Sequence, residues 1–146
     1  MPFLDKNLVA LGVEVESPEE AIVCVGNLLL KEGYVNRNYI KAMVNSYDKN
    51  GAYFVIAPKI AIPHARPEDG AKRSAISLAV LKKPIEFGHS KNDPVKLVFG
   101  LAASTSKEHL GMIQQISKLL MKKENIEKIS QAKDYSDIKK LKEGLE

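Results

Sequence analysis

Apolar residues recur at helical spacing in the first third of the chain. Ser17-Pro18-Glu19-Glu20 has the composition of a helix start: a capping serine, a proline suited to the first turn, and a glutamate that completes a capping box. The apolar stripe that follows has a period of roughly 3.6 residues and ends near Gly33, which predicts a helix. A second helix is predicted from about Asn38 to Tyr47, before the turn signal at Asn50-Gly51.

The middle of the chain carries short apolar runs that are typical of strands. Tyr53–Ala57 is β-branched and aromatic and stops at a proline. Val95–Ala102 is nearly all apolar, which predicts a strand that is covered on both faces. Two further extended segments are predicted at Ile60–Ile62 and at Ser74–Leu81, the latter ending before Pro84.

The last third returns to helical patterns. Thr105-Ser106-Lys107-Glu108 forms another capping box and opens a long helix that is predicted to reach about Lys123. Weaker helical stretches follow at Glu124–Ala132 and Ser136–Leu145. Because strands and helices interleave, the predicted fold class is α/β: a single domain over residues 1–146, with a mixed central β-sheet flanked by helices.

Composition adds limits to this picture. The 146 residues are 45% hydrophobic and 27% charged, as in ordinary globular domains. The first residues lack the layout of a signal peptide, and no apolar run approaches the roughly 20 residues needed to span a bilayer. We therefore expect a cytoplasmic protein. The single cysteine, Cys24, excludes an internal disulfide and a cysteine-rich zinc site.

The net charge of +4 gives no sign of a nucleic-acid partner. From Lys118 to Glu146, eight lysines alternate with six acidic residues, and no interleaved aromatic side chains are placed to stack on bases. Such alternation is typical of a solvated helix face.

Two of the three histidines occupy positions where chemistry is expected. His64 follows Pro63 at the end of an extended segment, and α/β folds place their sites at such strand ends. His109 precedes a helical apolar stripe, which puts it on the buried face and in the first turn, where backbone N–H groups favour an anion. Spacing alone also fits a loop histidine without a role and a hydrogen-bonded core histidine.

The third histidine, His89, lies in a polar connection and looks like an exposed loop residue. No histidine pair has the i, i+4 spacing of a helical metal site, so a zinc site is not expected. The glycines fit neither a phosphate-binding loop nor a dinucleotide fingerprint.

Two motifs together carry a family resemblance. The first is Ala57–Gly70, which reads Ala-Pro-Lys-Ile-Ala-Ile-Pro-His-Ala-Arg-Pro-Glu-Asp-Gly, and the second is Leu101-Ala102-Ala103 followed by Lys107-Glu108-His109-Leu110. The sequence resembles the enzyme IIA components of the phosphoenolpyruvate-dependent sugar phosphotransferase system, in the mannitol/fructose superfamily. The first motif is most similar to the ascorbate branch, and the order of elements matches from about Ser17 onward.

This resemblance implies a phosphoryl carrier for the uptake of a sugar, with an ascorbate-like sugar as the candidate, and its scheme requires neither a metal nor an organic cofactor. It implies that His64 accepts phosphate from the phosphocarrier HPr and passes it to a cysteine of enzyme IIB, with His109 as its partner in the site. The membrane component, enzyme IIC, would be met only indirectly. Arg66, two residues after the phosphoacceptor, is our candidate for a further phosphate-stabilising group.

Two departures from the family pattern bear on the site. The mannitol branch has an arginine near the position of Asp48, and this chain has none there, so a cation must come from elsewhere. Lys59 stands where the ascorbate branch is expected to have glycine, and a lysine would be strained there if the position needs a positive φ.

Two other functions remain open, a regulatory phosphoacceptor of the nitrogen-related type and a non-catalytic interaction domain with a decayed site. For the leading function we expect His64 to lie in a shallow depression that two partners use in turn. The expected rims are the loop 66–70 and the polar connection 87–94, because both are polar and follow or precede strand ends.

Overall fold

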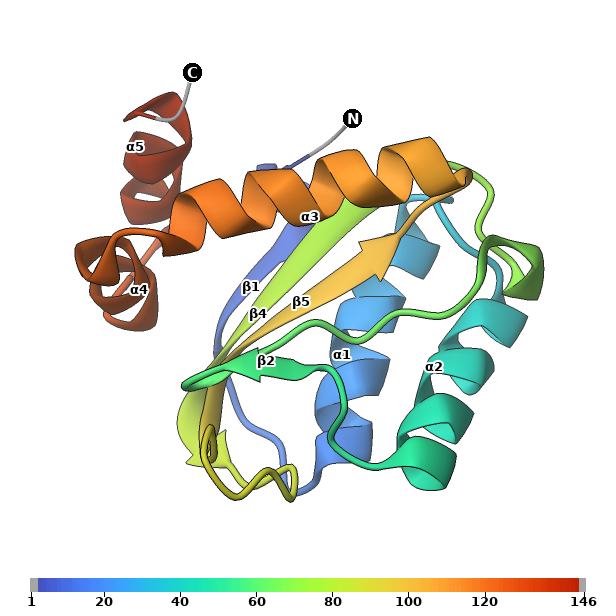
Figure 1. Ribbon diagram of the computed structural model, residues 1–146. Helices are drawn as coiled ribbons and strands as arrows, with labels where there is room; N and C mark the ends of the chain where they lie inside the picture. The colour runs from blue at the N-terminus through green and yellow to red at the C-terminus, as the bar shows by residue number, and fades with distance from the viewer. Residues whose placement is uncertain (1–2, 145–146) are drawn as a thin grey trace.

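A computed structural model describes residues 3–144 as five strands in one sheet with helices on both faces (Figure 1). The strand order is β1-β4-β5-β3-β2. β1 runs parallel to β4 and β3 runs parallel to β5, whereas the β4–β5 and β2–β3 pairs are antiparallel. The predicted mixed sheet is therefore confirmed. The elements are a 3-10 helix at Lys6–Leu8, β1 at Val9–Val13, α1 at Pro18–Lys31, α2 at Arg37–Asn50, β2 at Val55–Ala57, β3 at Ile60–Ala61, a 3-10 helix at Pro67–Asp69, β4 at Ala75–Ile85, β5 at Val95–Ala102, α3 at Ser106–Leu120, α4 at Lys123–Ser130 and α5 at Tyr135–Gly144.

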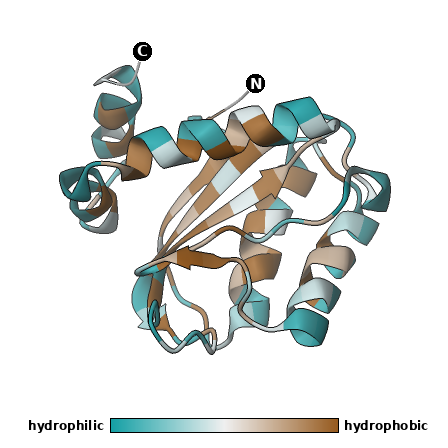
Figure 2. Ribbon diagram, viewed as in Figure 1, coloured by the Kyte–Doolittle hydropathy of each residue, from teal (hydrophilic) through white to brown (hydrophobic). Residues whose placement is uncertain are grey.

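The sheet separates two hydrophobic cores because successive strand residues point to opposite faces. Ala79 and Leu81 of β4 pack with α1 and α2, whereas Leu78 and Val80 pack with α3, α4 and α5. In Figure 1, α3 crosses one face of the sheet and α1 and α2 lie against the other. Figure 2 shows the matching pattern, with largely hydrophobic strands and alternating hydrophobic and hydrophilic patches along α3.

Most predicted elements are present, with shifted ends. Ser17 caps α1 by accepting the backbone N–H of Glu20, and Thr105 caps α3 in the same way. The second helix runs to Asn50, three residues beyond the predicted end at Tyr47. The last predicted helix is α5, and its predicted end at Leu145 lies outside the described residues.

Two strand predictions need correction. β1 was not predicted; it is a five-residue edge strand interrupted by Gly12, which has a φ of +61°. β4 does not stop before Pro84 but continues to Ile85. The pairing of β4 with β5 is irregular between Val80 and Ile85, so the missing N–H of Pro84 breaks no regular ladder there.

The conformation of Lys59 bears out the expectation of a strained lysine. Its φ is +71°, in the left-handed region that favours glycine. The surrounding backbone holds this turn, because the N–H of Lys59 donates to Asn92 and its carbonyl oxygen accepts from Lys96 and Leu97.

The topology brings the two predicted histidines to one end of the sheet. β3 and β5 are parallel neighbours, so the segments that follow them emerge at the same edge. An isolated bridge pairs His64 with Leu101 and extends this register. α3 begins shortly after β5 and carries His109 in its first turn. Among residues 3–144, no helix has both the length and the apolar character that crossing a membrane requires.

Candidate functional site

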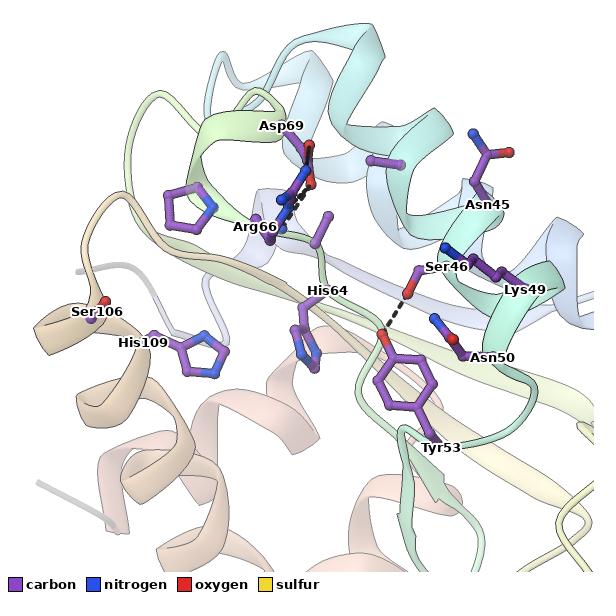
Figure 3. A pocket seen from close by; sticks show the side chains of 13 residues that line it. Asn45, Ser46, Lys49, Asn50, Tyr53, His64, Arg66, Asp69, Ser106 and His109 are labelled. Atoms are coloured by element: carbon purple, nitrogen blue, oxygen red, sulfur yellow. Dashed lines mark hydrogen bonds and ion pairs between the residues drawn. The ribbon is translucent and has the colours of Figure 1, made fainter.

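An open cavity of about 620 Å³ lies at this end of the sheet and contains both histidines. Three parts of the chain form its walls: the second half of α2 with the turn after it, the segment that follows β3, and the start of α3 (Figure 3). The lining residues are Ala42, Asn45, Ser46, Lys49, Asn50, Tyr53, His64, Ala65, Arg66, Pro67, Asp69, Ser106 and His109.

The imidazole of His64 is held in one tautomer by its own backbone. Its Nδ1 lies 2.9 Å from the carbonyl oxygen of Ile62. A carbonyl oxygen only accepts hydrogen bonds, so Nδ1 carries the proton and donates it. In the neutral ring the lone pair is then on Nε2. His64 is half-buried and lines the cavity, so a group bound there could reach its ring.

His109 faces His64 across the cavity. The two ring centroids are 5.3 Å apart, with an interplanar angle of 60°. The ring of His64 lies between His109 and Tyr53, whose centroid is 6.2 Å from that of His64 (Figure 3). Burial lowers the pKa of His109 below its ordinary value, and the neighbouring His64 lowers it further. The unliganded site therefore favours a neutral imidazole at His109.

Arg66 lies at the rim of the same cavity, but an acidic neighbour engages it. Its guanidinium forms an ion pair with Asp69 at 3.3 Å, and its backbone N–H also donates to that carboxylate. The hydrogen bond from Arg66 lowers the pKa of Asp69, so the carboxylate remains charged. The side chain of Arg66 is 74% exposed, and in Figure 3 it extends toward Asp69.

The backbone around His64 is fixed by a fully buried tyrosine of α2. The hydroxyl of Tyr39 donates to the carbonyl oxygen of Leu101 at 2.7 Å and accepts the N–H of Ala65 at 3.1 Å. The N–H of Leu101 donates in turn to the carbonyl oxygen of Pro63. Burial raises the pKa of Tyr39 to about 12, so the hydroxyl stays protonated and able to donate. These bonds tie the segment that carries His64 to both β5 and α2.

Sequence reasoning missed the wall that α2 contributes. Ala42, Asn45, Ser46 and Lys49 lie at spacings of three, four and seven residues, which is one face of a helix. The polar members of this stripe were the sequence signal that could have identified α2 as a wall of the site. The hydroxyl of Ser46 lies 2.7 Å from that of Tyr53, which joins the helix to the turn beside His64. Asp48 points elsewhere, since it does not line the cavity.

One of the two expected rims is correct. Arg66, Pro67 and Asp69 border the cavity, as predicted for the loop 66–70. The connection 87–94 does not border it, because it precedes β5 whereas His64 pairs with Leu101 near the other end of that strand. A polar loop next to a strand borders the site only if it lies at the same end of the strand, and the direction of β5 places residues 87–94 at the opposite end.

The chemistry of these walls defines a class of protein. An imidazole whose Nδ1 is bonded to the backbone, a second histidine beside it and cationic side chains at the edge suit the transfer of an anionic group. Among residues 3–144, no three His, Cys, Asp or Glu side chains gather closely enough to hold a metal ion. The class is thus a small α/β domain with a histidine pair at the carboxyl ends of parallel strands.

The family follows from the sequence as a whole. Residues 2–143 match the family described as "Phosphoenolpyruvate-dependent sugar phosphotransferase system, EIIA 2", and the chain belongs to it. Members of this family are phosphotransferase components of the sugar phosphotransferase system. The resemblance seen in the two motifs is thereby confirmed, and it extends over nearly the whole chain.

Relatives of two sugar specificities lie at similar distance. The ascorbate-specific EIIA component of Escherichia coli (strain K12) is 36% identical over 131 residues, which cover 89% of this chain and 85% of that protein. The mannitol-specific cryptic phosphotransferase enzyme IIA component of the same strain is 40% identical over 113 residues, covering 75% of this chain and 76% of that protein.

Solved structures confirm the fold. The complex of enzyme IIAMTL and phosphorylated enzyme IIBMTL from Escherichia coli contains a chain that matches with a TM-score of 0.86 and 26% identity over 99% of both chains. The nitrogen regulatory protein IIA-Ntr from Neisseria meningitidis matches with a TM-score of 0.76 and 18% identity over 94% of both chains, and at that identity it shares the fold alone.

Proposed function

We propose that His64 is the phosphoacceptor of this enzyme IIA and that Nε2 is the atom that carries the phosphoryl group. The observation that supports this most directly is the hydrogen bond from Nδ1 to the carbonyl oxygen of Ile62, because it leaves the lone pair of Nε2 in the open cavity. A phosphoryl carrier needs a nitrogen that attacks phosphorus and later leaves, and a neutral imidazole does both.

The transfer then takes place in two displacements. The lone pair of Nε2 attacks the phosphorus of a phosphohistidine on HPr; the bond from phosphorus to the donor nitrogen breaks, and its electron pair returns to the donor ring. A cysteine thiolate of enzyme IIB next attacks the same phosphorus, and the electron pair of the broken bond returns to His64. The proton stays on Nδ1 of His64 throughout, hydrogen-bonded to the carbonyl oxygen of Ile62, and the scheme uses neither a metal nor an organic cofactor.

His109 and Arg66 act on the charge of the phosphoryl oxygens. His109 is close enough to contact a group on His64. A dianion there favours the protonated imidazolium of His109, which can then donate a hydrogen bond to the phosphoryl oxygens. Arg66 offers a guanidinium at the rim, but its ion pair with Asp69 limits its contribution. The charge spreads over three oxygens in the transition state, so positioned donors and cations provide most of the rate enhancement.

The partners and the location follow from this relay. HPr would supply the phosphoryl group. Enzyme IIB would receive it, and the complex of the mannitol relative with phosphorylated enzyme IIB supports that part of the relay. Enzyme IIC would be reached only through enzyme IIB, and the relay would operate in the cytoplasm. The ascorbate-specific and mannitol-specific relatives support a sugar-uptake role, with an ascorbate-like sugar as the candidate.

A regulatory role of the nitrogen-related type has weaker support. The neighbour of that kind is 18% identical, whereas the two sugar-specific relatives are 36% and 40% identical. A decayed site is likewise disfavoured, because the histidine pair, the tautomer and the cavity are all intact.

The decisive test is reconstitution with phosphoenolpyruvate, enzyme I and HPr, followed by mapping of the acid-labile phosphate. We expect one phosphate on Nε2 of His64, identified by 15N NMR of the ring. Phosphate on another residue, or no phosphate with active HPr, would contradict the proposal.

Docking can be tested separately by NMR titration with HPr and with enzyme IIB. Both partners must approach the same nitrogen, so they should shift overlapping sets of amides around His64 and His109 and should compete. Amides of residues 87–94, at the far end of β5, should not shift. Simultaneous binding of both partners would favour the regulatory alternative.

A further inference from the structure

A phosphoryl group in this cavity would meet very little uncommitted positive charge. Among the described residues that line it, the cationic side chains are Lys49 and Arg66, and the acidic one is Asp69. A phosphoryl group carries close to two negative charges at neutral pH. The protein is therefore expected to provide a cation that is free to approach it.

Arg66 is poorly suited to be that cation. Two of its guanidinium nitrogens donate to the carboxylate of Asp69, at 3.4 and 3.3 Å, and its backbone N–H donates to the same group at 3.0 Å. The carboxylate cancels most of the local charge. A phosphoryl group would have to compete with Asp69 for the guanidinium and would also be repelled by that carboxylate.

Lys49 lies on the opposite wall and has no such competitor. It is exposed in the last turn of α2, and no ion pair joins it to any residue of the described chain. In Figure 3 its ammonium end is turned toward Ser46 and the cavity. The bond between Ser46 and Tyr53 fixes this end of α2 beside the ring that contacts His64, so the lysine stem starts close to the site.

We propose that Lys49 supplies the cation that contacts the phosphoryl group on Nε2 of His64, from the side opposite His109. The inference rests on the proposed function and identifies a catalytic residue for it. The flexible ammonium of lysine suits a group that arrives and leaves, because it needs no fixed fork geometry. Lys49 would thus replace the missing arginine near Asp48 from the adjacent position in the helix.

The test compares Lys49→Gln with Lys41→Gln, an exposed lysine of the same helix that does not line the cavity. Single-turnover phosphorylation by phospho-HPr is measured over a range of donor concentrations. We expect Lys49→Gln to lower the maximal rate about tenfold or more, as for the loss of one charge-assisted hydrogen bond. Lys41→Gln should match the unaltered protein, and Lys49→Arg should retain most of the rate.

Three outcomes would overturn the inference. An unchanged maximal rate in Lys49→Gln would remove the role. A change confined to the half-saturating concentration of phospho-HPr would make Lys49 a docking residue only. A thermal unfolding midpoint that falls together with the rate would assign the lysine to helix stability, since a cation also stabilises a helix C-terminus. If His64→Ala still accepted phosphate, the proposed function would fail instead.

Discussion

A polar segment with a histidine lies beside each end of β5, and the two histidines are bonded in different ways. At the carboxyl end, Nδ1 of His64 donates to Ile62 and leaves Nε2 open to a cavity. At the amino end, Nδ1 of His89 accepts the backbone N–H groups of Lys91 and Asn92, at 3.3 and 3.1 Å. The same ring nitrogen donates a hydrogen bond at one end of the strand and accepts two at the other, where it holds the loop together.

Asp93 completes the contrast at the amino end. Its carboxylate accepts the backbone N–H groups of Phe87, Gly88 and His89. The polar groups of this loop therefore satisfy one another, and few are left to bind anything else. Around His64, by contrast, the polar side chains of α2 and α3 turn into a common cavity. Function at this sheet edge depends on which polar groups are left unpaired, and a polar composition alone does not reveal that.

The largest effect is expected from removing His64. His64→Ala should abolish acid-labile phosphate labelling, because it removes the ring whose Nε2 is the proposed acceptor. His89→Ala should label fully. Both variants are assayed with phosphoenolpyruvate, enzyme I and HPr, and circular dichroism checks that each is folded. Full labelling of His64→Ala would break the comparison at its first step.

Loss of His109 should be the next largest effect. His109→Ala should still accept some phosphate but should pass it to enzyme IIB more than about tenfold more slowly, the scale of one charge-assisted hydrogen bond of 1.5–3 kcal/mol. The measurement is the rate of transfer from the isolated phosphoprotein to enzyme IIB. His89→Ala serves again as the matched control, and an onward rate equal to that control would remove His109 from the mechanism.

Removal of the Asp93 carboxylate should lower stability without slowing phosphoryl transfer, the opposite of what is expected for the histidine variants. Asp93→Ala leaves three backbone donors of the loop dependent on water, so we expect a loss of about 1–2 kcal/mol in the free energy of unfolding. Phosphoryl transfer should be unchanged, because the loop does not border the cavity. Chemical denaturation and the transfer assay on the same sample separate the two effects. A slower transfer without a stability loss would show that the far loop takes part in the relay.

The outline of the fold was predictable because it depends on local signals. Ser17 and Thr105 both cap the helices that their sequences indicate, and Val95–Ala102 forms the strand that its apolar run predicts. β1 was missed because it is a short edge strand whose register comes from pairing with β4, a partner far away in the sequence. The end of β4 was predicted too early, before Pro84, because a single sequence does not reveal that the pairing with β5 is irregular there.

Only the part of the site that lies in short sequence motifs was predictable. The histidines and Arg66 belong to short motifs, so their place at the sheet edge followed from the elements that carry them. Lys49 and Tyr53 enter the cavity only because α2 packs beside the segment after β3, and the ion pair of Arg66 with Asp69 depends on a 3-10 turn at Pro67–Asp69. Contacts of this kind are set by packing, which the periodicity of one helix does not specify.

The smallest effect concerns the charge of His109 and tests how the two rings act together. Burial is the larger cause of its lowered pKa and His64 is the smaller one. His64→Gln should therefore raise the pKa of His109 only part of the way to the ordinary value. A neutral ring in the folded state means that the unfolded state binds more protons below about pH 6.5, so this group's contribution to stability is lost as the pH falls. The loss should be small, because the ring is only partly buried.

Phosphorylation should reverse the direction of that shift. A dianionic phosphoryl group on His64 lies close to His109, and a nearby negative charge favours the protonated imidazolium. The 15N and 13C shifts of His109, followed by NMR against pH, should give a higher pKa in the phosphorylated protein than in either the free protein or His64→Gln. His109 would then be a neutral ring while the site is empty and a charged donor once it is loaded. An unchanged pKa on phosphorylation would mean that His109 does not contact the phosphoryl group, and the carboxyl end of β5 would then depend on His64 and Lys49 without it.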